Sequence, residues 1–123
     1  MIQITEIAFT GYPVTDIVRA RNFYEKVLLL KITATFENEG RHWIEYDIGP
    51  STIAITNMSP DWKPSGAGPA AALEVVDFDA AVAALREASV KFVVEPTTSP
   101  ACRLAVVADP DGNTVAIHKR THL

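Results

Sequence analysis

The sequence repeats one pattern of predicted elements, and the two copies divide the chain into halves. In the first copy an apolar strand precedes a helix that opens at Asp16, and further apolar strands follow it. In the second copy the helix opens with Asp77-Phe78-Asp79, again between apolar strands. A repeat of this length constrains the architecture, because each copy has to form the same supersecondary unit. The sequence therefore predicts an α+β fold of two βαβββ modules, at residues 1–57 and 69–123, joined by a proline- and glycine-rich linker at 58–68.

Hydrophobic periodicity and turn signals place the individual elements. In the first module we expect a strand at 2–10 that Gly11-Tyr12-Pro13 ends, and a helix from Asp16 to Leu28. A strand at 32–36 and a hairpin of residues 43–47 and 52–56 follow. Thr15 or Asp16 is suited to cap that helix. In the second module we expect a strand at 70–76 and a helix that is capped by Asp77 or Asp79 and ends near Ala88. A strand at 91–95 and a loop at 96–100 follow. The module ends with a hairpin of 103–107 and 114–119, whose turn is Asp109-Pro110-Asp111-Gly112.

Size and composition limit the function. The chain has 123 residues, 48% of them hydrophobic, and a net charge of −4. It contains no cluster of basic residues, so a nucleic-acid partner is not expected. No long apolar run predicts a membrane span, and no basic-then-apolar leader is present, so we expect a cytoplasmic location. Cys102 is the only cysteine, which excludes an internal disulfide and a cysteine-rich metal site.

Alternation along the two hairpins predicts which side chains share a face. In the first hairpin we pair Trp43 with Thr56 and Glu45 with Ala54, which leaves Ile44, Tyr46, Ile53 and Ile55 for the opposite, helix-covered face. In the second hairpin we pair Ala108 with Asn113 and Arg103 with His118. That register puts Arg103 and His118 on the open face and Cys102 on the helix side, as an inert core residue.

The two βαβββ units, the helix that opens with Asp and runs into Phe23-Tyr24, and the final turn Asp109-Pro110-Asp111-Gly112-Asn113 together resemble the vicinal oxygen chelate superfamily. That superfamily includes glyoxalase I, bleomycin-resistance proteins and extradiol dioxygenases. The resemblance covers nearly the whole chain. It implies curled mixed sheets, each with its helix on the convex side and a concave cup for a ligand. It also implies a homodimer, which the two small modules with open cups favour. Leu29 departs from the pattern, because the helix in this family usually ends in glycine.

The resemblance also implies where a divalent metal would be bound, and this chain departs from it there. The positions that correspond to the usual ligands are occupied by Phe9, Ala54, Ala70 and Ala116. None of these side chains has a donor atom, so we expect no metal at these positions and no metal cofactor. A divalent ion held at displaced positions remains an alternative.

Three interpretations of function follow. The first is a metal-free protein that binds a small planar molecule, cationic or hydroxylated, in a cup with aromatic and carboxylate groups. The second is a lyase, isomerase or dioxygenase with a rebuilt site, in which Glu45, Glu74 and His118 hold a metal or one Glu acts as a base. The third is an accessory domain with no ligand. The candidate catalytic residues are Glu45, Glu74 and His118, and the candidate ligand-binding residues are Phe9, Trp43, Thr56 and Arg103. We also expect a contact between Arg103 and one of the two glutamates.

Overall fold

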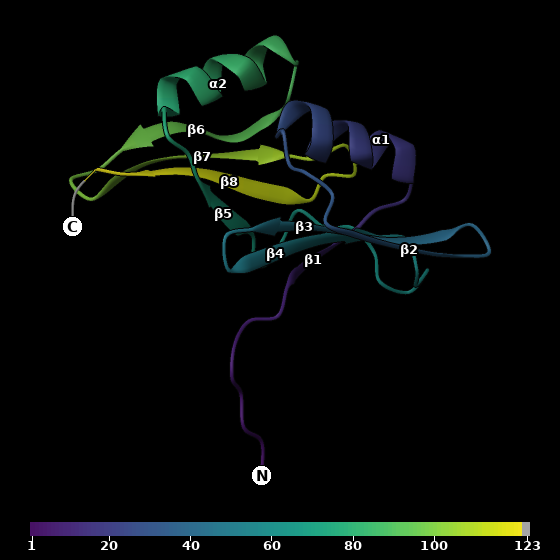
Figure 1. Ribbon diagram of the computed structural model, residues 1–123. Coiled ribbons are helices and arrows are strands. Elements are labelled where there is room, and N and C mark those ends of the chain that lie inside the picture. The colour runs from purple at the N-terminus through teal and green to yellow at the C-terminus, as the bar shows by residue number, and fades with distance from the viewer. Residues whose placement is uncertain (122–123) are drawn as a thin grey trace. The chain divides into compact units, whose positions relative to one another are not determined.

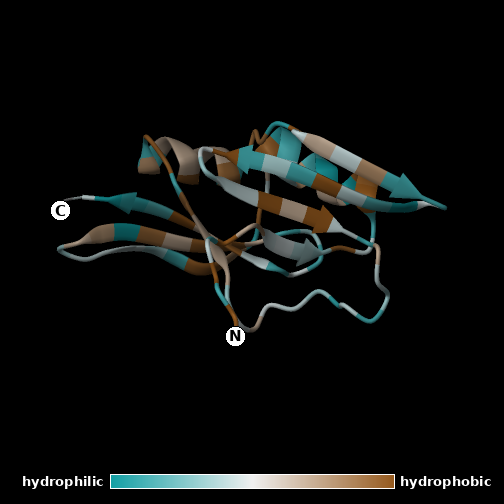
Figure 2. Cartoon of the chain, turned by 60° about the horizontal axis from the view of Figure 1, so that its bottom comes forward, coloured by the Kyte–Doolittle hydropathy of each residue, from teal (hydrophilic) through white to brown (hydrophobic). Residues whose placement is uncertain are grey.

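The computed structural model describes residues 1–121. These residues form two compact units, one of Met1–Lys63 and one that begins at Pro64 (Figure 1). The division between them falls within residues 58–68. Each unit contains a four-stranded sheet with one helical segment over one face. Hydrophobic and hydrophilic residues alternate along the strands, so each sheet has a buried face and a second face of different character (Figure 2).

Unit 1 has the strand order β1-β4-β3-β2, with β1 parallel to β4 and the other pairs antiparallel. The helical segment lies between β1 and β2 in the sequence, which gives the predicted βαβββ order. The elements are β1 (Thr10–Pro13), α1 (Ile17–Arg21), the π-helix η1 (Asn22–Val27), β2 (Ala34–Asn38), β3 (Arg41–Ile48) and β4 (Ser51–Thr56).

Unit 2 repeats this topology with the strand order β5-β8-β7-β6. Strands β5 and β8 are parallel, and β8 pairs with β7 and β7 with β6 in antiparallel fashion. The elements are β5 (Ala71–Glu74), α2 (Phe78–Glu87), β6 (Phe92–Thr98), β7 (Cys102–Ala108) and β8 (Thr114–Arg120). The fold class predicted from the repeat is confirmed.

Both helices begin at an aspartate cap, as the sequence predicts. The Asp16 carboxylate accepts a hydrogen bond of 3.0 Å from the Arg19 backbone N–H, and Asp77 accepts one of 3.0 Å from that of Ala80. Both helical segments also end at a residue with positive φ, Leu29 at 61° and Ser89 at 59°. Leu29 therefore adopts the conformation that glycine would adopt more easily.

The π-helix is explained by the number of residues between the capping aspartate and the residue with positive φ. Leu29 follows Asp16 by 13 residues, whereas Ser89 follows Asp77 by 12. Unit 1 therefore fits one additional residue between the same cap and the same ending. A wider turn with i to i+5 hydrogen bonds absorbs that residue, as in the bond of 2.9 Å from the Leu28 N–H to the Phe23 carbonyl.

Two predicted strands differ from the structure by more than two residues at an end. Residues 2–9 do not form a strand: β1 starts at Thr10 and includes Gly11-Tyr12-Pro13, which we expected to end it. The preceding segment leaves the sheet (Figure 1) and exposes Ile2, Ile4 and Ile7 at 88%, 85% and 81%. In unit 2, β6 continues through Pro96 to Thr98. Pro96 is tolerated because β6 is an edge strand and its pairing with β7 shifts register on both sides of Val94.

The register of the first hairpin is confirmed and that of the second is wrong by one residue. In unit 1, Trp43 pairs with Thr56 and Glu45 with Ala54. In unit 2, Ala108 pairs with Thr114 rather than Asn113, so Arg103 pairs with Lys119 and His118 with Leu104. The cause is the turn. The Asp109 carboxylate accepts hydrogen bonds of 2.9 Å from both the N–H and the side-chain amide of Asn113, which draws Asn113 into the loop.

Candidate functional site

The face of the unit 1 sheet that points away from the helix carries four aromatic side chains, which we call the aromatic face: Phe9, Phe36, Trp43 and Trp62. The Phe9 and Trp43 rings pack edge to face with their centroids 5.0 Å apart. Phe36 is directly opposite Trp43 in the β2–β3 pair. Phe9, Trp62 and Phe36 remain 42%, 41% and 59% exposed, which is unusual for side chains of this size on one face.

Gly11 makes the close approach of Trp62 possible. A Cβ atom at this position would lie 2.5 Å from Cη2 of Trp62 and 3.2 Å from Cε1 of Phe9. Trp62 belongs to the segment after β4, so the absent side chain at Gly11 lets that segment place its indole against β1. Ala54, the partner of Gly11 in β4, is fully buried although it lies on the same face.

Glu45 supplies a carboxylate beside Trp43 on the aromatic face. Its Oε2 accepts a hydrogen bond of 2.8 Å from the indole N–H of Trp43, two residues earlier on the same strand. This bond fixes the Trp43 ring and leaves the carboxylate beside the aromatic side chains. Thr56, the other predicted ligand-binding residue here, is 2% exposed. Its hydroxyl donates to the His42 carbonyl and accepts from the Met58 N–H, so it holds the start of the linker.

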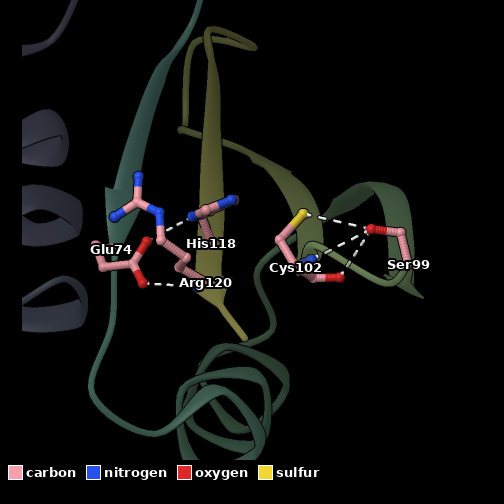
Figure 3. A network of polar contacts seen from close by, with 5 residues as sticks. All are labelled: Glu74, Ser99, Cys102, His118 and Arg120. Carbon is pink, nitrogen blue, oxygen red and sulfur yellow. Dashed lines mark hydrogen bonds and ion pairs between the residues drawn. The ribbon is translucent and has the colours of Figure 1, made fainter. Parts of the chain in front are cut away.

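The corresponding face of unit 2 has a different character and carries a carboxylate–imidazole pair. Glu74 on β5 and His118 on β8 are direct partners in the parallel pairing. The Glu74 Oε1 atom lies 2.5 Å from Nδ1 of His118, and Oε2 accepts a hydrogen bond of 2.7 Å from the Arg120 N–H (Figure 3). The Arg120 backbone N–H and the His118 side chain, in that order, lower the pKa of Glu74 below its ordinary 4.5.

Arg103 does not lie on this face, which corrects its predicted place in the ligand site. It points to the helix side, where its guanidinium lies 4.5 Å from the centroid of the Phe78 ring and 2.9 Å from the Asp79 carboxylate. The expected contact of Arg103 with Glu45 or Glu74 is therefore replaced by one with Asp79. Because the register differs by one residue, Arg103 and His118 are on opposite faces, and Cys102 shares the face of His118 rather than the helix side.

The three candidate catalytic residues are divided between the units, with Glu45 in unit 1 and the Glu74–His118 pair in unit 2. Within residues 1–121, no group of three His, Cys, Asp or Glu side chains is placed to hold a metal ion. Phe9, Ala54, Ala70 and Ala116 have no donor atoms, so the positions implied by the resemblance do not fit a metal. Whether any of the candidate residues binds a ligand stays a prediction.

The sequence interpretation missed two contributors to the aromatic face. Phe36 follows from the same alternation that gave Trp43, once the β2–β3 pairing around Glu39-Gly40 is included. Gly11 was interpreted as a strand breaker, and only the position of Trp62 reveals its role. Trp62 lies in the predicted linker, and the sequence leaves open whether this side chain lies over the rim of a cup or anchors the linker.

Solved structures of the same fold cover nearly the whole chain. One is TnmS3, an antibiotic binding protein from Streptomyces sp. CB03234, with 24% identity and a TM-score of 0.80 over 98% of this chain and 100% of that one. Another is a glyoxalase/bleomycin resistance protein from the same organism, with 25% identity and a TM-score of 0.74 over 91% and 98%. A glyoxalase family protein from Bacillus anthracis has 17% identity and a TM-score of 0.78 over 98% and 99%. No curated protein matches the chain.

These structures share the fold of this chain, which consists of two βαβββ units. The sequence model of the Glyoxalase/Bleomycin resistance protein/Dioxygenase superfamily matches residues 6–117, so the chain belongs to this superfamily, as its resemblance indicated. No helix within residues 1–121 has the length and apolar character needed to cross a membrane.

Proposed function

We propose that this protein binds a planar small molecule on the aromatic face, without a metal ion. The observation that carries the proposal is the grouping of Phe9, Phe36, Trp43 and Trp62, partly exposed, around the oriented carboxylate of Glu45. Flat apolar surface favours stacking of a planar ligand, and the carboxylate favours a cationic or hydroxylated one. An antibiotic binding protein has the same fold, which supports a small-molecule ligand.

The metal-free part of the proposal rests on donor chemistry. A divalent ion needs several oxygen, nitrogen or sulfur ligands at one place. The four positions implied by the family supply none, and no group of three His, Cys, Asp or Glu side chains within residues 1–121 is placed to supply them. Dialysis against a chelator is therefore expected to leave ligand binding unchanged.

Intrinsic fluorescence provides a direct test, because both tryptophans of the chain, Trp43 and Trp62, lie on the aromatic face. We expect 9-aminoacridine, a planar cation, to quench this fluorescence at lower concentration than naphthalene-2-sulfonate, a planar anion. Glu45→Gln should reduce the preference for the cation by about threefold to tenfold, because one contact between a carboxylate and a cation is worth about 1 kcal/mol.

Glu37→Gln is the matched control, because Glu37 is on β2 of the same sheet but pairs with His42, on the alternation opposite to Trp43. This variant should bind both probes as the wild type does. Trp62→Ala should weaken binding of the cation at least tenfold, followed through the remaining Trp43. If Trp62→Ala binds each probe as tightly as the wild type binds it, the aromatic face is not the ligand site.

We also propose that the protein acts as a cytoplasmic homodimer. The exposed Ile2, Ile4 and Ile7 support a dimer, because they form apolar surface that a second copy would cover. Sedimentation at micromolar concentration should give a mass of two chains, and a monomer would contradict the proposal.

A further inference from the structure

The hydrogen bonds of the Glu74–His118 pair fix which nitrogen of the His118 imidazole carries the proton. Glu74 is ionised at neutral pH, because the Arg120 N–H and His118 lower its pKa. An ionised carboxylate can only accept hydrogen bonds. The bond between Glu74 Oε1 and Nδ1 of His118 therefore requires that Nδ1 donates. In the neutral ring this leaves Nε2 with its lone pair.

No side chain or backbone group within residues 1–121 is a hydrogen-bond partner of Nε2 of His118. The contacts of His118 within residues 1–121 are made through Nδ1, and the side chain is 23% exposed. In Figure 3 the ring extends from β8 with Nδ1 toward Glu74 and its other nitrogen pointing away from it. A carboxylate that holds an imidazole through one nitrogen and leaves the other nitrogen with its lone pair is the arrangement of a general base.

The surroundings of Nε2 indicate the kind of molecule that it would meet. Leu104 is the partner of His118 in β7, and Ala116 and Val106 form the next row on the same face. Leu104 and Val106 are partly exposed and Val94, which pairs with Val106, is 41% exposed. One proton acceptor beside an apolar strip suits an apolar ring that carries an acidic hydroxyl. Arg120 follows His118 by two residues on β8, and its positive charge, which also acts on Glu74, would favour the resulting anion.

We propose that Glu74 and His118 form a proton-acceptor site for phenols and enols on the face of unit 2 that points away from α2. In the step, the O–H bond of the ligand breaks and an N–H bond forms at Nε2 of His118. The electron pair stays on the ligand oxygen, and Glu74 remains ionised against the new imidazolium. His118 is the catalytic residue, and Glu74 is a positioning residue that acts through it. The site does not depend on the aromatic face of unit 1.

The test uses 4-nitrophenol, whose absorbance changes when it loses its proton, and its methyl ether 4-nitroanisole, which has no proton to give. At a pH below the pKa of the free phenol, the wild-type protein should raise the phenolate absorbance. It should bind the ether at least about tenfold more weakly, the difference expected for a hydrogen bond that involves a charged group. A wild type that gives no phenolate signal, or binds the two probes equally, overturns the proposal.

Two variants and a control locate the effect. His118→Gln keeps a hydrogen-bonding side chain but no base, and should abolish the phenolate signal while circular dichroism stays unchanged. Glu74→Gln offers Nδ1 an amide and frees the ring to carry its proton on Nε2, so the signal should fall severalfold. His42→Gln removes the histidine of unit 1 whose Nδ1 lies 3.5 Å from Glu37, and should change nothing. A signal that survives His118→Gln overturns the proposal.

The tautomer can be measured without any ligand. In protein labelled with ¹⁵N, two-bond proton–nitrogen spectra should show the proton of neutral His118 on Nδ1, and on Nε2 in Glu74→Gln. An Nε2 proton in the wild type would contradict the assignment even if the phenol binds elsewhere. Because tryptophan quenching reports the aromatic face and phenolate absorbance reports His118, this proposal and the proposed function can fail separately.

Discussion

The two units follow one topology, yet they differ in how the buried layer is held. In unit 1 a polar link joins helix and sheet: the hydroxyl of the fully buried Tyr46 donates to Glu25 Oε2 at 2.8 Å, and Arg21 donates to the same oxygen at 2.9 Å. Burial, followed by this bond to Glu25, raises the pKa of Tyr46. In unit 2 the buried layer is apolar, with Ala105, Val107, Val115 and Ile117 buried under Phe78 and Leu85. The ion pair of Arg103 with Asp79 also joins sheet and helix there, but it is accessible to solvent. A polar interior is thus one solution for this layer, and not a requirement of the fold.

The faces away from the helices differ as well, and the hairpins explain how one topology allows this. The first hairpin closes with Ile48 opposite Ser51, so only Gly49 and Pro50 form its loop. The second closes with Ala108 opposite Thr114, around a loop that runs from Asp109 to Asn113. Loop length sets register, and register decides which side chains reach which face. Unit 1 presents aromatic rings and Glu45, whereas unit 2 presents the Glu74–His118 pair.

The largest expected effect tests whether the two hairpins are held differently. Asp109 is 4% exposed and its carboxylate accepts from the N–H groups of Asp111 and Asn113, both at 2.9 Å. Asp109→Ala leaves these donors without their acceptor and should lower the free energy of unfolding by about 2–4 kcal/mol. Asp47→Ala in the first hairpin removes only the exposed bond from the Thr52 hydroxyl, and should cost less than about 0.5 kcal/mol. Urea denaturation measures both, and equal losses would contradict the comparison.

That second turn is also where the sequence was hardest to interpret. The repeat, the helix caps at Asp16 and Asp77 and the register of the first hairpin are local patterns, and each could be predicted. The Asp109 turn was recognised, but its string does not show that the carboxylate will hold Asn113 inside the loop rather than in β8. This one residue moved Arg103 to the helix side and Cys102 to the face of His118. The Glu74–His118 contact joins residues far apart in sequence, so only the pairing of β5 with β8 reveals it.

The helix ends provide a second comparison, with a smaller effect. Leu29 has a φ of 61° and is 73% exposed, so it bears the steric cost of the left-handed region and gains little by burial. Replacing it with glycine should raise the free energy of unfolding by about 0.5–1 kcal/mol, since that region costs about 1–2 kcal/mol and glycine loses part of this in chain entropy. Ser89→Gly tests the same position in unit 2, where φ is 59°.

We expect both glycine variants to be more stable in thermal melts, because both helical segments end in the same way despite the π-helix in unit 1. If Leu29→Gly is less stable than the wild type and Ser89→Gly is not, the Leu29 side chain stabilises the wider turn of the π-helix. In that case the additional residue between Asp16 and Leu29 does more than fill the available length.

The smallest expected effect is on stability at low pH. It distinguishes the Glu74–His118 pair from the Glu37–His42 pair of unit 1. The pKa of Glu74 is below its ordinary 4.5, so its ionised form stabilises the folded state. That contribution is fully present above pH 4.5 and is lost as the pH falls through the folded-state pKa.

Glu74→Gln should therefore lose less stability than the wild type between about pH 6 and about pH 3. Glu37→Gln is the control, because the Glu37 carboxylate lies 3.5 Å from Nδ1 of His42 but, within residues 1–121, lacks a backbone hydrogen bond like the one that Glu74 accepts from the Arg120 N–H. Chemical denaturation across this range should show the wild type and Glu37→Gln losing stability in parallel, with Glu74→Gln following a shallower curve. Three parallel curves would mean that the Arg120 N–H and His118 do not hold the carboxylate in solution, and the oriented imidazole would then lose its support.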